Sequence, residues 1–226
     1  MPLRISFDLD GVLADFAGAF RKVELQLFGP PATAGSDVPE PEEGQQVQQE
    51  EARRSQGRRD AIWREIEKTP DFWMTLEPLD RTGTARIHEL SLRYEWEVFF
   101  VTQRPATAGE TVQRQTQRWL VGQGFDLPSV IVLNGWRGRA IHALSIDYHV
   151  DDSTQHCLDV VADATARTIL VSSNPSDGAV EGARKMGIAP AFNIAEALEI
   201  LEQATLARTN PTMLQRLSAL VGWRLS

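Results

Sequence analysis

Two pairs of aspartates carry the strongest chemical signal in this 226-residue sequence. Asp8 and Asp10 lie in the segment FDLDG, where an apolar, strand-like run ends, and Asp151 and Asp152 end the run IDYHVDD in the same way. Side chains along a strand alternate between its two sides, so residues two apart project to the same side. Ligands gather beyond the carboxyl ends of the strands in an open parallel sheet. We therefore expect the four carboxylates to converge at one edge of a sheet.

Carboxylates that converge in this way repel one another and need a cation. Hard oxygen ligands favour Mg²⁺, which keeps several of its waters and commonly bridges to a substrate phosphate. The alternative for Asp151 and Asp152 is that they only cap a helix that begins near Ser153. Because Asp8 and Asp10 end another strand in the same way, we favour a magnesium site with these four residues as its ligands.

A third strand end could bind a phosphate. The run WEVFFVT ends at Thr102 and is followed by Gln103, Arg104 and Pro105. A hydroxyl group and adjacent backbone N–H groups near the start of a helix can cradle a phosphate. We expect Thr102 and Gln103 to be phosphate-binding, although the same segment would be an ordinary strand-to-helix turn in many proteins.

The elements that must position these residues alternate along the chain. Five β-rich apolar runs occupy residues 3–9, 96–102, 129–134, 146–152 and 167–173, with helical patterns between them. Strands that are almost continuously apolar and separated by helices imply a parallel sheet covered on both faces. The sequence thus predicts an α/β fold with a doubly wound parallel sheet. Capping-box spacing predicts helix starts at Thr107 with Glu110 and at Asn193 with Glu196.

Residues 16–80 differ in character from the rest of the chain. A helical stripe of apolar residues begins at Phe16 and ends before Gly29 and Pro30. The segment 34–58 is rich in Glu, Gln, Arg and Pro, which predicts a mobile start that leads into an exposed helix. We interpret 16–80 as a small helical cap, with a mobile segment at 34–58, inserted into a core formed by residues 1–15 and 81–226.

Composition excludes several classes of protein. A net charge of −8 and a pI near 5.1 disfavour binding to a nucleic acid polymer, which needs clustered Lys and Arg. No apolar run approaches the roughly 18 residues of a membrane-spanning helix, so we expect a cytoplasmic protein with no membrane association. The single cysteine, Cys157, excludes an internal disulfide and is expected to pack in the core. Four scattered histidines disfavour a zinc site, so any metal should be held by oxygen.

These motifs, in this order, resemble the haloacid dehalogenase superfamily. Its pattern is a strand ending DxDGT or DxDGV, a strand ending in Thr or Ser, a Lys, and a strand ending in an acidic pair; all but the Lys are present here between residues 5 and 153. The resemblance implies a Rossmann-like core and a magnesium-dependent phosphomonoester hydrolase that acts through an aspartyl-phosphate intermediate. It implies that Asp8 is the nucleophile and that Asp10 is the general acid/base and a metal ligand through its carbonyl. It makes Thr102 a phosphate contact, and Asp151 and Asp152 the metal-site acids.

The chain departs from this pattern at the Lys. The stretch NGWRGRAIHAL contains none, and Arg137 or Arg139 could take its place as a permanent cation with planar donors for phosphate. The alternatives are that both arginines are surface residues at a helix start, or that the protein binds phosphate without turning it over.

A narrower resemblance, carried by GVLADF and DFWMTLEPLD, is to the 5′(3′)-deoxyribonucleotidase branch. It implies that Phe72 and Trp73 line a substrate pocket for a nucleobase, since aromatic faces suit a planar group. The alternative is that they pack the cap against the core. We expect a small phosphorylated metabolite as substrate, with 5′-nucleotides first, and a monomer or homodimer. The competing functions are a sugar-phosphate or other metabolite phosphatase and a catalytically weak phosphate-binding protein.

Overall fold

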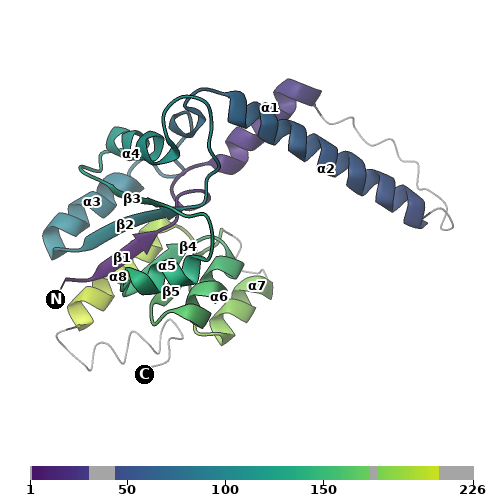
Figure 1. Cartoon of the computed structure of the whole chain (residues 1–226). Coiled ribbons are helices and arrows are strands. Elements are labelled where there is room, and N and C mark those ends of the chain that lie inside the picture. The colour runs from purple at the N-terminus through teal and green to yellow at the C-terminus, as the bar shows by residue number, and fades with distance from the viewer. Residues whose placement is uncertain (1, 31–43, 174–177, 209–226) are drawn as a thin grey trace.

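The computed structural model describes residues 2–30, 44–173 and 178–208, and its centre is a sheet of six parallel strands (Figure 1). The strand order is β3-β2-β1-β4-β5-β6. The strands are β1 (Arg4–Phe7), β2 (Glu97–Thr102), β3 (Ser129–Val132), β4 (Tyr148–Asp151), β5 (Arg167–Val171) and β6 (Ala189–Ala191). The α/β, doubly wound parallel sheet predicted from the sequence is confirmed.

Strand β1 lies in the interior of the sheet, between β2 and β4. Ile5 pairs in parallel register with Val98 on one side and with Tyr148 on the other. Ile5 and Phe7 project to one face of the sheet and are buried in the core, while Ser6 projects to the other face and is buried against His149. The order reverses at this strand, which is where ligands bind in folds of this class. The sequence therefore brings Asp8 to the middle of the sheet's carboxyl edge.

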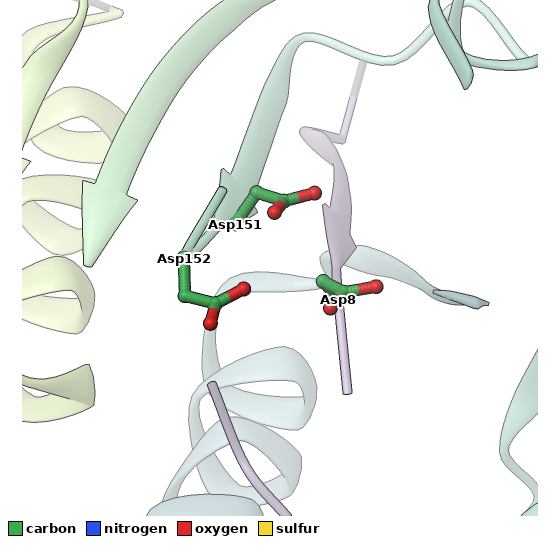
Figure 2. Close-up of side chains that lie close together, drawn as sticks. All are labelled: Asp8, Asp151 and Asp152. Atoms are coloured by element: carbon green, nitrogen blue, oxygen red, sulfur yellow. The ribbon is translucent and has the colours of Figure 1, made fainter. Parts of the chain in front are cut away.

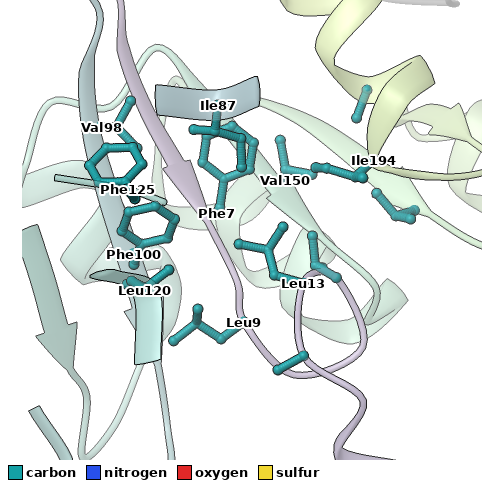
Figure 3. Close-up of a cluster of buried hydrophobic side chains, with 14 of the residues drawn as sticks. Phe7, Leu9, Leu13, Ile87, Val98, Phe100, Leu120, Phe125, Val150 and Ile194 are labelled. Carbon is teal, nitrogen blue, oxygen red and sulfur yellow. The ribbon is translucent and has the colours of Figure 1, made fainter. Parts of the chain in front are cut away.

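Helices cover both faces of the sheet. One face packs against α3 (Gly83–Tyr94), α4 (Val112–Gly122) and α8 (Ile194–Ala207), and the other against α5 (Arg137–Ala143), α6 (Thr154–Asp163) and α7 (Gly178–Lys185). Phe7 and Phe100 project toward the first group, where they meet Ile87 of α3 and Leu120 of α4 (Figure 3). Each of these four side chains is fully buried.

The structure corrects the sequence analysis at two elements. Helix α4 begins at Val112, with Thr111 as its N-cap accepting a hydrogen bond from the Arg114 amide, so the helix start predicted at Thr107 is wrong. Strand β6 was not predicted, because it has three residues and Pro190 lacks the amide hydrogen that a strand normally donates. The helix start predicted at Asn193 is confirmed, since its side chain accepts from the Glu196 amide.

Between β1 and α3, the residues that the structure describes form two long helices and a short one. Asp15 N-caps α1 (Phe16–Phe28) by accepting from the Gly18 amide, and α2 (Gly44–Lys68) and the 3₁₀ helix η2 (Phe72–Met74) follow. Figure 1 shows α2 running alongside α1 and extending away from the sheet. Of the segment 34–58, residues 34–43 lie outside the described part of the chain, and the others are helical in α2.

Two indole groups attach the end of this inserted segment to the core. Trp73 donates from Nε1 to the Pro105 carbonyl at 3.0 Å, and Trp119 of α4 donates to the Leu76 carbonyl at 2.8 Å. These bonds hold η2 over the loop that follows β2. Among the residues that the structure describes, no helix is long and apolar enough to cross a membrane.

Candidate active site

Three of the predicted metal-site acids meet at the carboxyl edge of the sheet. Asp8, Asp151 and Asp152 each offer a carboxylate oxygen within 4.8 Å of the others, and Figure 2 shows them at the ends of β1 and β4. The Asp8 amide donates to the Val150 carbonyl at 2.8 Å, which continues the pairing of the two strands to this point. Asp8 and Asp151 are buried, while the side chain of Asp152 reaches solvent. The three acids thus come from two adjacent strands at a single place.

Gly11 allows the loop after β1 to pass close to Asp152. Its φ of +84° lies in the left-handed region, which glycine adopts without strain. A Cβ at this position would lie 1.9 Å from Oδ2 of Asp152. The turn closes where the Gly11 amide donates to the Ala14 carbonyl. A side chain at this position would therefore be strained by the backbone conformation and would displace the carboxylate of Asp152.

Arg137, at the start of α5, supplies the positive charge of the cluster. Its Nη1 lies 2.7 Å from Oδ1 of Asp8 and 2.9 Å from Oδ2 of Asp151, and its side chain is only 2% exposed. Its Nε is buried without a hydrogen-bond partner. Arg139 instead lies on the exposed side of the helix, with its guanidinium over the Trp136 ring. Of the two arginines proposed for the missing Lys, the structure brings Arg137 to the acids and leaves Arg139 at the surface.

Asp151 is held from several directions. Oδ2 meets Nε2 of His149 at 3.0 Å as well as Arg137, and Oδ1 accepts from the Ser153 amide at 2.8 Å and contacts Nδ1 of His156 at 3.3 Å. Nδ1 of His149 in turn contacts the Ser6 hydroxyl at 2.8 Å. Because both oxygens of Asp151 are engaged, Asp8 and Asp152 are the acids best placed to face a ligand.

The pKa values of the three acids differ because their surroundings differ. Burial, and then the charge of Asp151, raise the pKa of Asp8 against the opposing effect of Arg137. Burial alone would raise the pKa of Asp151, but the hydrogen bonds from His149 and His156 hold it well below its usual range. Desolvation by burial, and then the charge of Asp151, raise the pKa of Asp152 to about 6 although its side chain reaches solvent.

This donor set fits a hard divalent cation. Carboxylate oxygens that converge within 4.8 Å can act as ligands for such an ion. The raised pKa values of Asp8 and Asp152 show that negative charge is unfavourable in the protein alone, and a cation between them would relieve that repulsion. The acidic cluster can therefore hold a metal ion.

Asp10 lies apart from this cluster and is engaged by Arg104. Nε of Arg104 donates to Oδ2 of Asp10 at 2.9 Å, and Nη2 donates to Oδ1 at 2.7 Å. The sequence analysis placed Arg104 at the strand end but assigned it no role. Its pairing with Asp10 could have been suspected, because Arg104 is a permanent cation two residues after Thr102, at the edge of the sheet where the acidic pair was expected.

The remaining predicted residues lie around this centre. Thr102 is buried at the end of β2, and the Gln103 side chain donates to the Gly135 carbonyl at 2.7 Å, which ties this strand end to the turn before α5.

Phe72 and Trp73 are both buried. Phe72 borders a cavity of about 480 Å³ beside α1. The Trp73 ring lies beneath the Arg104 guanidinium, 4.7 Å from ring centroid to carbon. Trp73 is thus the one of the two that contacts the arginine bound to Asp10.

Comparisons with known proteins agree with this architecture. A family profile described as 5′ nucleotidase, deoxy (Pyrimidine), cytosolic type C protein matches residues 2–186. No curated protein sequence matches the chain.

Three solved structures share the fold. A putative beta-phosphoglucomutase from Thermotoga maritima is 20% identical, with 88% of this chain and 98% of that chain covered and a TM-score of 0.51. A HAD family hydrolase from Deinococcus radiodurans R1, with bound phosphate and sodium, is 16% identical, with 92% and 96% covered and a TM-score of 0.52. A haloacid dehalogenase-like family hydrolase from Streptococcus pneumoniae is 12% identical, with 88% and 98% covered and a TM-score of 0.53.

The match to the family profile spans most of the chain, including every acid of the site. The solved structures share the fold of this chain, whose centre is the doubly wound parallel sheet. The resemblance inferred from the sequence is therefore confirmed: the chain belongs to the deoxy (pyrimidine), cytosolic type C family of 5′ nucleotidases within the haloacid dehalogenase superfamily, and it is a phosphatase.

Proposed function

We propose that the protein is a magnesium-dependent phosphomonoester hydrolase that acts through an aspartyl-phosphate on Asp8. The observation that carries the proposal is the position of Asp8 at the end of an interior strand, where it contacts Arg137 and lies within 4.8 Å of carboxylate oxygens of Asp151 and Asp152. A buried carboxylate beside a permanent cation is suited to attack an anionic phosphoryl group, because the cation offsets the charge that the two reactants bring together.

The reaction proceeds in two displacements. In the first, a carboxylate oxygen of Asp8 forms a bond to phosphorus while the bond from phosphorus to the leaving oxygen breaks, and the leaving oxygen takes a proton from Asp10. In the second, water attacks phosphorus, its proton passes to Asp10, and the bond to Asp8 breaks to release inorganic phosphate. Arg137 balances the charge of Asp8 in both steps.

Asp8 and Asp152, with the Asp10 carbonyl, are the groups that would hold Mg²⁺. When bound, the ion would neutralise charge on the phosphoryl oxygens. Asp151 serves a different purpose in this arrangement, because its two oxygens already engage Arg137, His149, His156 and the Ser153 amide. Its role is to hold Arg137 beside Asp8. Thr102 and the amides that follow it are the phosphate contacts we propose at the end of β2.

The substrate class we propose is pyrimidine deoxyribonucleoside 5′-monophosphates, in keeping with the description of the matching family. Trp73 does not contribute to this proposal, because its ring is 1% exposed, lies beneath Arg104 and packs against Phe16 of α1 at 5.7 Å between ring centroids.

The test is phosphate release from ribo- and deoxyribonucleoside 5′-monophosphates and from sugar phosphates, with Mg²⁺ or with EDTA. We expect turnover of the nucleotides that needs Mg²⁺ and is lost in Asp8→Asn. Protein quenched in acid during turnover should carry covalent phosphate in the wild type and none in Asp8→Asn. Preference for sugar phosphates would support the alternative of a sugar-phosphate phosphatase. Absence of turnover across the panel would support the alternative of a protein that binds phosphate without hydrolysing it.

A further inference from the structure

Arg104 binds the proposed general acid in a two-point contact. Two different nitrogens of its guanidinium, Nε and Nη2, each donate to a different oxygen of Asp10, at 2.9 and 2.7 Å. A planar guanidinium and a planar carboxylate joined in this way lie in a common plane, so the contact fixes the orientation of the carboxylate as well as its position.

The guanidinium is itself held in place on its remaining sides. Nη1 donates to the Thr116 hydroxyl of α4 at 3.1 Å, and the Trp73 ring lies under its face. Trp73 is in turn fixed by the Pro105 carbonyl through Nε1 and by the Gln115 side chain through its amide. Every nitrogen of the Arg104 guanidinium therefore has a protein partner, and the group has little freedom to turn.

The two members of this pair differ in their access to solvent. The Arg104 side chain is 1% exposed, whereas the Asp10 side chain is 24% exposed. The arginine thus supports the carboxylate from the interior, and the carboxylate keeps an open side. Arg137 is arranged differently, because it lies between two acids and contacts Asp8 directly.

We propose that Arg104 is a positioning residue that aims the carboxyl group of Asp10 at the leaving oxygen of the substrate; this inference rests on the proposed function. Arg104 does not touch the reacting atoms. It acts by keeping Asp10 in the orientation from which the proton is delivered as the bond from phosphorus to oxygen breaks. General-acid catalysis depends on such alignment.

The need for this proton depends on the leaving group, and this dependence separates positioning from general damage to the fold. A nucleoside leaves as an alkoxide, which is a poor leaving group unless it is protonated. A nitrophenol leaves as a stable anion and needs no proton. A change that only misaligns Asp10 should therefore slow transfer of the phosphoryl group from a nucleoside 5′-monophosphate to Asp8 and spare the same transfer from p-nitrophenyl phosphate. The second displacement, in which Asp10 takes a proton from water, is common to both substrates and does not enter kcat/KM.

The experiment compares kcat/KM, which reports the first displacement, for these two substrates in wild type, Arg104→Gln, Arg104→Lys and Thr116→Val, with Mg²⁺. For Arg104→Gln we expect a loss of roughly 100-fold on the nucleotide and under about threefold on the nitrophenyl ester, since general-acid catalysis contributes about 10²–10⁴-fold. Thr116→Val keeps Arg104, preserves the volume of the side chain at position 116 and removes only the hydroxyl group. It should shift the ratio of the two rates, nucleotide to nitrophenyl ester, in the same direction by a smaller factor. The combination of Asp10→Asn with Arg104→Gln should be no slower on the nucleotide than Asp10→Asn alone.

Arg114→Gln is the matched control, because this arginine lies on the same helix as Thr116 with its side chain 68% exposed. It should leave both rates unchanged. Equal losses on the two substrates for Arg104→Gln and Thr116→Val would overturn the positioning role while leaving the proposed function intact. Absence of magnesium-dependent turnover of either substrate in the wild type would overturn the proposed function, and this inference with it. If Arg104→Gln does not fold, the positioning role is tested by the ratio of the rates on the two substrates, measured in Arg104→Lys and Thr116→Val.

Discussion

At the scale of single residues, Arg137 is the side chain on which the site depends most for its charge balance. It joins Asp8 and Asp151, and all three side chains are at most 7% exposed. Removing one member of a buried ion pair leaves a charge with neither water nor a partner. Here it would leave two carboxylates facing each other.

We therefore predict that Arg137→Met lowers the free energy of unfolding by about 3–5 kcal/mol in the absence of metal. Arg139→Met, two positions along the same helix, should change it by no more than about 0.5 kcal/mol, because this side chain is exposed. Urea denaturation of the two variants in EDTA measures both values. Similar losses in the two variants would contradict the assignment of Arg137 as the buried cation.

The same two arginines show what could be predicted from the sequence and what could not. The positions of Asp8, Asp151 and Asp152 follow from local rules, since each ends an apolar strand and parallel strands share a carboxyl edge. The choice between Arg137 and Arg139 depends on which face of α5 turns toward the sheet, and that is set by packing against α6. The pairing of Arg104 with Asp10 joins residues 94 positions apart, which no local pattern reveals.

At the scale of elements, the close packing of α5 against α6 sets the position of Arg137. Gly138 follows Arg137, and a Cβ there would lie 2.3 Å from the Asp159 carbonyl oxygen and 2.7 Å from Cβ of Asp163. The two helices can approach this closely only because position 138 has no side chain. The backbone of α6 cannot move away without disturbing β4 and β5, against which it packs.

We predict that Gly138→Ala destabilises the protein by about 1–3 kcal/mol, as overpacked substitutions do, and lowers kcat by displacing Arg137 from Asp8. Gly57→Ala is the control. It lies within α2, and a Cβ there would have no neighbouring atom within 4 Å, so the substitution should raise stability by up to about 1 kcal/mol, the helix preference of Ala over Gly. Thermal unfolding and a kcat measurement suffice, and a neutral Gly138→Ala would show that α5 and α6 are not in close contact.

Elements also differ in how well the sequence predicts them. The five long apolar runs correspond to β1 to β5, because burial on both faces leaves a strong pattern. Strand β6 has three residues, one of them Pro190, and it is recognisable only once β5 is in place beside it.

The division into a core of 1–15 and 81–226 and a cap of 16–80 remains our proposal. Phe72 and Trp73 of η2 belong to the same buried cluster as the sheet residues Phe7 and Phe100.

At the scale of the whole molecule, the acidic cluster links stability to pH. The pKa of Asp152 is raised to about 6 by desolvation and then by the charge of Asp151, so the folded protein binds this proton more tightly than the unfolded chain does. The stability contributed by this group is present below the ordinary aspartate pKa and is lost as pH rises through about 6. Asp8 acts in the same direction.

We predict that, in EDTA, the Tm of the wild type relative to Asp152→Asn falls as pH rises from about 4 to about 7, because Asn has no proton to lose. The difference between the two proteins removes the contributions of other groups, including His149, whose pKa is lowered by burial. Saturating Mg²⁺ should raise the Tm of the wild type most at the upper end of this range. A difference that is constant with pH, or that grows in favour of the wild type, would contradict the raised pKa.

Gly11 restricts which alleles of the gene can encode a working protein. Any codon change that replaces this glycine adds a Cβ where Oδ2 of Asp152 lies 1.9 Å away, on a backbone with a φ of +84°. The position neither donates a proton nor binds phosphate through a side chain, yet it tolerates no missense allele without moving an acid of the site. Alleles that change codon 11 are therefore expected to lower activity, although they remove none of the proposed catalytic groups.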